Sequence, residues 1–134
     1  MVQRIQTIYL LFACILTTFI FKLVFVETTV SNETPVFNSL PLTIFIGVII
    51  LLHFVIIGMY KKRIRQVRVT VFTIILLLVL SGLFFYFTYI GIGGTKVEFI
   101  IPAILALATI ILDFLAIYSI KKDEELIRSL NRIR

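Results

Sequence analysis

The chain has 134 residues, 60% of them hydrophobic, and a formal net charge of +6. Its mean hydropathy of +1.14 lies far above that of soluble globular domains and excludes a water-soluble fold. Four apolar stretches account for this value, at about residues 5–26, 42–60, 69–90 and 97–120. About 20 helical residues cross a hydrocarbon core of about 30 Å. The sequence therefore predicts an all-α membrane protein, with four transmembrane helices in one bundle formed by residues 1–120.

The first stretch carries two side chains of interest, Cys14 and Lys22. Cys14 is the only cysteine in the sequence, so an internal disulfide is excluded. Lys22 lies about one turn from the end of the stretch, and its ammonium group is expected to extend to the headgroup level. The polar segment Glu27–Pro35 that follows is rich in β-branched residues and ends in proline, so we expect a loop rather than a helix there.

Basic residues gather on one side of the four stretches. Arg4 precedes the first stretch, and two groups follow the second and the fourth: Lys61, Lys62, Arg63, Arg65 and Arg68, then Lys121, Lys122, Arg128, Arg132 and Arg134. The positive-inside rule therefore predicts that both termini are cytoplasmic and that residues 27–41 and 91–98 face outward. We expect the basic residues to contact anionic lipid headgroups. The short link after the second stretch has no interleaved aromatic residues, so nucleic-acid binding is not predicted.

Two titratable side chains, His53 and Asp113, are expected inside the bilayer. They lie eight residues before Lys61 and Lys121, respectively, hence at the same depth, about 12 Å from the cytoplasmic boundary. The neighbours of His53 on its own helix face are apolar, so its partner must come from another helix or from water. Asp113 falls in a stripe of small residues that suits close helix packing: Ala103, Ala106, Thr109 and Ala116. This stripe is expected to face the bundle or a partner subunit.

Two interpretations of Asp113 follow. It is either part of a hydrogen-bonded interhelical pair, with His53 or with a hydroxyl such as that of Thr73 or Tyr9, or part of a proton relay or ion site with His53. The absence of a run of polar pore-lining residues favours the first. With one histidine in the chain and no second carboxylate near Asp113, we predict no catalytic residue, no metal site and no cofactor, and hence no enzyme.

Residues 121–134 form a basic amphipathic segment. Leu126, Ile127, Leu130 and Ile133 share one face of a helix, and Glu124 precedes Arg128 by four residues, an order that stabilises helices. We predict a short cytoplasmic helix that continues the fourth span. Its apolar side needs a cover, which is the link at residues 61–68, the membrane surface or a partner protein.

Three segments resemble a known family: Met1–Leu11, the link Arg63–Arg68 and the terminus Ile120–Arg134. Together with the chain length and the order of the spans, they are similar to the four-span membrane family of Bacteroidota called domain of unknown function 4293. The resemblance implies a multi-pass protein of the bacterial inner membrane. It implies no activity, substrate or catalytic residue.

These features favour a non-enzymatic scaffold, assembly factor or accessory subunit of a membrane protein complex. The expected partners are anionic lipids, and other membrane proteins or a second copy of the chain. The alternative is a small oligomeric ion- or proton-coupled transporter or channel that uses His53 and Asp113. Because four helices rarely enclose a polar path, the alternative requires at least a dimer.

Overall fold

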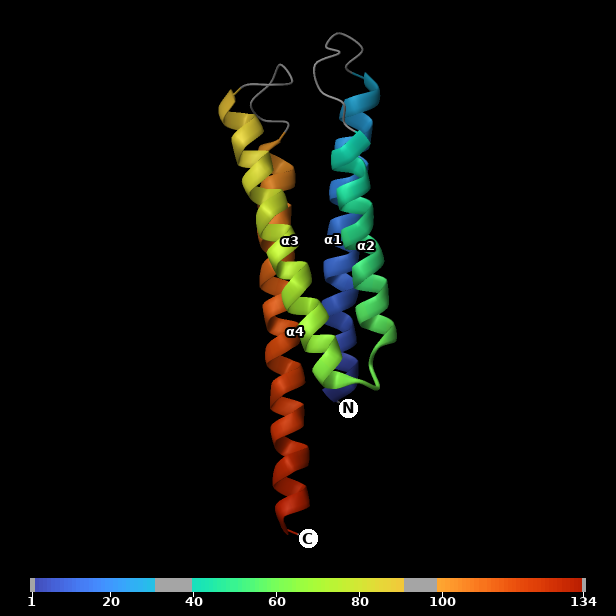
Figure 1. Ribbon diagram of the computed structural model, residues 1–134, viewed down its shortest axis with the longest axis vertical. Helices are drawn as coiled ribbons and strands as arrows, with labels where there is room; N and C mark the ends of the chain where they lie inside the picture. The colour runs from blue at the N-terminus through green and yellow to red at the C-terminus, as the bar shows by residue number, and fades with distance from the viewer. Residues whose placement is uncertain (1, 31–39, 91–98, 134) are drawn as a thin grey trace.

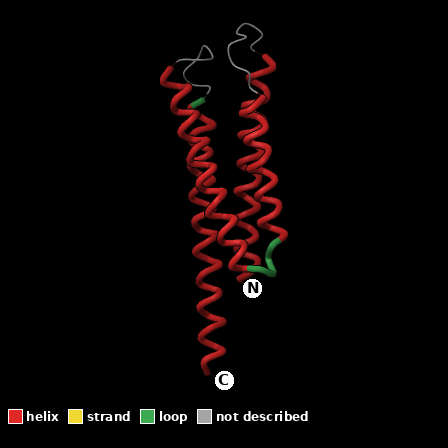
Figure 2. The backbone as a smooth tube through the Cα atoms, viewed as in Figure 1, coloured by secondary structure: helices red, strands yellow, loops and turns green. Residues whose placement is uncertain are grey.

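The computed structural model describes residues 2–30, 40–90 and 99–133. These residues form four long helices: α1 (Val2–Val30), α2 (Leu40–Gly58), α3 (Arg63–Ile90) and α4 (Ile100–Ile133). Within the described ranges the rest is short turns, and there is no strand (Figure 2). The predicted all-α class is confirmed.

Each of the four helices is long and apolar enough to cross a membrane, over Ile5–Phe25, Pro41–Gly58, Arg63–Ile90 and Ile100–Ile133. Large apolar side chains point away from the bundle; Leu51 is 65% exposed and Ile111 is 61% exposed. Apolar surface of this extent is stable only against lipid or another protein. The chain is therefore a multi-pass membrane protein, as predicted.

The helices pack in cyclic order around a common axis. α1 contacts α2 and α4, and α3 contacts α2 and α4, whereas the diagonal pairs make no close backbone contact in the described residues. The N-terminal end of α1, the α2–α3 link and the C-terminal end of α4 all lie at one end of the bundle (Figure 1). That end carries the basic residues on which the predicted topology rests.

The core consists of two apolar clusters. The larger, mainly in the half away from the termini, contains Ile20, Ile46, Ile49, Ile74, Leu77, Phe84, Ala103 and Ile110, among others. The smaller, nearer the α2–α3 link, contains Leu10, Ile56 and Ala116, with Tyr9 and Val69 packed against it. Ile117 and the partly buried Val67 also belong to the larger cluster.

Several predicted boundaries differ from the observed ends of the helices. α1 continues to Val30, so the loop predicted from Glu27 is wrong for its first four residues. The β-branched residues there cost only a few tenths of a kcal/mol each, which a long preformed helix tolerates. α2 ends at Gly58 instead of residue 60, and the chain turns there, with the Lys62 amide donating to the Met59 carbonyl oxygen over 2.9 Å. α3 begins at Arg63 instead of residue 69, because helical hydrogen bonding extends past the apolar stretch.

The rest of the predicted outer loops, at residues 31–39 and 91–98, lies outside the described residues. α4 is one unbroken helix of 34 residues, which corresponds to a length of about 51 Å. Its C-terminal part extends beyond the other helices (Figure 1). We call residues 121–133 of α4 the tail helix.

Candidate functional site

His53 and Asp113 meet in the centre of the bundle. The Nε2 atom of His53 lies 3.4 Å from the Oδ1 atom of Asp113, and both side chains are 0% exposed. They come from α2 and α4, which stand diagonally across the bundle and make no close backbone contact. The two side chains therefore meet across the central axis of the bundle. The two residues, which the sequence places at the same depth in the bilayer, are in contact.

The hydrogen bonds of His53 fix where its ring protons lie. Its Nδ1 atom is 2.9 Å from the backbone oxygen of Ile49, and because a carbonyl oxygen can only accept, Nδ1 carries a proton and donates it. Nε2 is then the atom that faces Asp113. In the described part of the chain, neither Nε2 nor either carboxylate oxygen of Asp113 has a hydrogen-bond partner.

Three threonines of α1 and α3 are also buried inside the bundle. Thr17, Thr70 and Thr73 are fully buried, and each hydroxyl donates to the carbonyl oxygen four residues earlier in its own helix, over 2.8, 2.8 and 2.9 Å. These hydroxyl protons are not available to Asp113, so the alternative bond from Thr73 is not formed. We call Thr17, His53, Thr70, Thr73 and Asp113 the buried polar layer.

The small-residue stripe of α4 lies inside the bundle. Ala103, Ala106, Thr109 and Ala116 are each 0% exposed, and α4 contacts α1 and α3. Small side chains let these backbones approach closely. Because the stripe and Asp113 are covered by the helices of the same chain, they do not form a surface that a second subunit can reach.

A second buried polar contact lies nearer the termini. The Gln6 side-chain amide donates to Oδ2 of Asp123 over 2.8 Å and to the backbone oxygen of Ser119 over 3.3 Å, and Gln66 donates to the backbone oxygen of Ile56 over 3.2 Å. Sequence reasoning missed these contacts. The sequence did indicate that Asp123 is buried, because it follows Ala116 by seven residues and so lies on the same face of α4 as the small-residue stripe.

The basic residues border a groove between the α2–α3 link and the tail helix. We call it the basic groove; its lining residues are Lys61, Lys62, Arg63, Ile64, Arg65, Glu124, Ile127 and Arg128. Arg128 pairs with Glu124 over 3.0 Å, and among the described residues no carboxylate pairs with the other cations. Arg68, Lys121, Lys122 and Arg132 are exposed nearby along the same helices, and Arg134 lies outside the described residues. The groove therefore carries an excess of positive charge.

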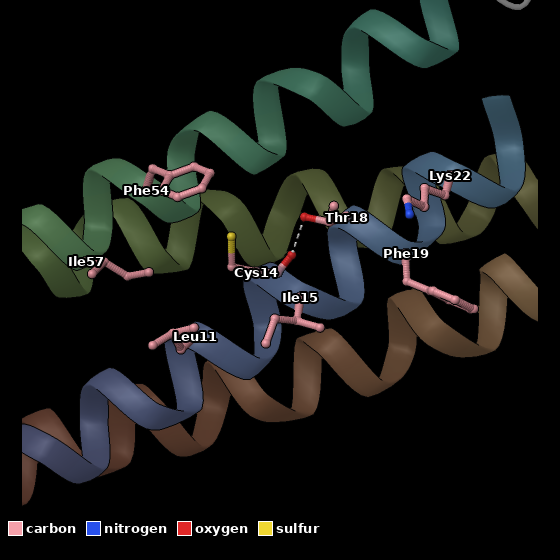
Figure 3. Close-up of a pocket in the computed structure, with 8 residues that line it drawn as sticks. All are labelled: Leu11, Cys14, Ile15, Thr18, Phe19, Lys22, Phe54 and Ile57. Carbon is pink, nitrogen blue, oxygen red and sulfur yellow. Dashed lines mark hydrogen bonds between the residues drawn. The ribbon is translucent and has the colours of Figure 1, made fainter.

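A second groove opens on the lipid-facing surface between α1 and α2 (Figure 3). It is lined by Leu11, Cys14, Ile15, Thr18, Phe19, Lys22, Phe54 and Ile57. The Thr18 hydroxyl donates to the backbone oxygen of Cys14 over 2.8 Å, and the Cys14 side chain is buried. Apart from the Lys22 ammonium group the lining is mostly apolar, and these eight residues form no cluster of reactive side chains.

Comparisons with known proteins bear on family but not on activity. Neither a curated protein nor a solved structure matches the chain significantly. Among the described residues, no group of three histidine, cysteine or acidic side chains is placed to hold a metal ion. The model of a domain of unknown function, DUF4293, matches residues 2–133, nearly the whole chain. The chain therefore belongs to the DUF4293 family of four-helix proteins.

Proposed function

We propose that this protein is a non-enzymatic accessory subunit, scaffold or assembly factor of a membrane protein complex, and that it docks through the tail helix. The observation that carries the proposal is the exposed apolar side of this helix. Leu126 and Leu130 are 50% and 64% exposed, and Ile133 is 83% exposed. An amphipathic helix that projects from its own bundle is stabilised when its apolar side is covered.

Charge on the tail helix points to a partner at the membrane surface. Arg128 and Arg132 lie on the same projecting segment as the exposed leucines, and the basic groove adjoins it. Each basic residue near an anionic leaflet contributes about 1 kcal/mol of attraction. We propose that anionic headgroups occupy the basic groove and hold the tail helix close to the membrane, where its apolar side meets a neighbouring protein.

The second candidate function is an oligomeric ion- or proton-coupled transporter or channel. One observation favours it, since the facing atoms of His53 and Asp113 have no hydrogen-bond partner among the described residues. The position of the pair argues against it. Asp113 is 0% exposed, and in the described part of the chain the helices of the same chain enclose it, which argues against a subunit seam at this residue.

Orientation in the membrane is part of the proposal. We infer that the end with both termini and the α2–α3 link faces the cytoplasm and that the membrane is the bacterial inner membrane. Support comes from the excess of lysine and arginine at this end of the bundle, which disfavours translocation. On this orientation the tail helix and the basic groove are both cytoplasmic.

Reporter fusions test the orientation. We expect fusions after Arg65 and Arg134 to give a cytoplasmic signal, and fusions after Asn32 and Gly94 to give a signal from the opposite side, because the clusters of basic residues flank the first pair, whereas Lys96 alone lies beside the second. Activity of a reporter that needs translocation, paired with one that needs the cytoplasm, measures this. A cytoplasmic signal from Asn32 would contradict the proposed topology.

Photo-crosslinking in native membranes tests docking. A photoreactive residue in place of Leu130 on the tail helix is expected to give a discrete protein adduct, because this side chain points away from the bundle. Phe85, which is 49% exposed on the membrane-spanning part of α3, is the matched control and is expected to give lipid adducts. Lipid adducts alone from both positions would count against a docking role.

A further inference from the structure

We propose that His53 and Asp113 together bind one proton, shared between Nε2 of His53 and Oδ1 of Asp113. This assigns a proton-binding site to the centre of the bundle. The assignment does not depend on the docking proposed above, since it rests on the geometry of the buried polar layer alone.

Nδ1 of His53 carries a proton. Because Nδ1 donates to the Ile49 carbonyl oxygen over 2.9 Å, a neutral imidazole presents a bare lone pair at Nε2. That lone pair faces Oδ1 of Asp113 at 3.4 Å. With no further proton, two acceptors would point at each other, and the pair would carry a full negative charge.

The number of protons bound sets the net charge of the His53–Asp113 pair. One proton makes the pair neutral overall, either as a carboxylic acid that donates to Nε2 or as an imidazolium that donates to the carboxylate. Two protons would leave an imidazolium beside a carboxylic acid, with a net positive charge. Both side chains are 0% exposed, and an uncompensated charge in this environment is strongly disfavoured. The one-proton state alone is neutral and places a donor between the two atoms.

Other buried polar side chains lie on the helices around the pair. From α3, the hydroxyl protons of Thr70 and Thr73 are donated to backbone oxygens. From α1, Thr17 does the same, while Cys14 lines the lipid-facing groove. The nearest other buried charged residue on α4 is Asp123, ten residues or about 15 Å away, and it accepts from Gln6. Among the described residues, none of these groups supplies a compensating charge or a donor.

Nuclear magnetic resonance of the intact chain in lipid bilayers tests the proposal. The sequence has one histidine and two aspartates, so labelling histidine with ¹⁵N and aspartate with ¹³C gives an assignable spectrum, with Asp123→Asn identifying the second carboxyl signal. The chain must be purified without a histidine tag. At pH 7.5 we expect either a protonated Nε2 with an ionised Asp113, or an unprotonated Nε2 with a protonated Asp113. An unprotonated Nε2 beside an ionised Asp113, or protons on both, would overturn the proposal.

Proton release on unfolding gives a second readout. At pH 8, an unfolded chain holds a single ring proton on the neutral imidazole and none on the Asp113 carboxylate, one proton fewer than the folded pair would hold. Denaturation in a weakly buffered solution is therefore expected to release one more proton per chain from the wild type than from Asp113→Asn, whose amide donates to Nε2 without a titrating proton. Equal release from the two proteins would contradict the assignment.

Discussion

Substituting His53 with leucine is expected to lower the free energy of unfolding of the bundle by about 3–5 kcal/mol, the usual cost of removing one partner of a buried ionisable pair. The substitution leaves Asp113 fully buried and removes the one side chain that faces its carboxyl group among the described residues. Asp113→Leu leaves only a neutral imidazole nitrogen unpaired, so we expect a smaller loss, of about 1–3 kcal/mol. Equilibrium unfolding in mild detergent, followed by helical circular dichroism, measures both.

Two matched variants distinguish loss of the His53–Asp113 interaction from the destabilisation that any substitution can cause. Lys22→Ala removes an exposed cation outside the bundle core and is expected to change the free energy of unfolding by about 0.5 kcal/mol or less. The double variant His53→Leu/Asp113→Leu replaces the whole pair with apolar side chains and is expected to be more stable than His53→Leu alone. Additive losses in the double variant would show that the two side chains do not interact.

Much of the fold could be predicted from the sequence because apolar length and flanking charge are local properties. A run of about 20 apolar residues is long enough to cross a bilayer whatever its neighbours are, and four helices long and apolar enough to do so are present. The ends of the helices were less accurate, as Val30 and Arg63 show. Hydropathy marks the part of a helix that lies in the hydrocarbon, whereas backbone hydrogen bonds continue into the headgroup region.

The depth of His53 and Asp113 in the bilayer could be predicted from the sequence, but the residues that contact each of them could not. His53 and Asp113 could be placed at one level by counting from the basic boundary. Their contact depends on the order of helices around the axis, which puts α2 and α4 on a diagonal and which no local pattern encodes. The Gln6–Asp123 contact was missed for a related reason, because polar residues near span ends are ordinarily solvated at the headgroup level.

Removing residues 125–134 is expected to leave the four helices inserted and to abolish association with the partner. The cut falls after Glu124, so the contacts of Gln6 with Ser119 and Asp123 remain. The loss of the exposed Arg128–Glu124 pair costs about 0.5 kcal/mol or less. Protease protection measures insertion. Failure of the shortened chain to insert would show that the tail helix belongs to the folding unit.

A full-length control separates the two sides of the tail helix. Leu130→Glu combined with Ile133→Glu keeps the length of the chain and removes the apolar side, and it is expected to behave as the deletion does. Arg128→Gln combined with Arg132→Gln keeps the apolar side and removes two cations, worth about 2 kcal/mol near an anionic leaflet. It is expected to weaken membrane contact while leaving some protein association.

The central claim is that this chain acts by holding another membrane protein at its cytoplasmic end. The most direct measurement is the composition of the complex purified from native membranes in mild detergent, compared between the full chain and the chain ending at Glu124. The account predicts a second protein in fixed stoichiometry with the full chain, and its loss from the shortened chain. Recovery of the full chain only as copies of itself, unchanged by the deletion, would contradict the claim and favour the transporter or channel.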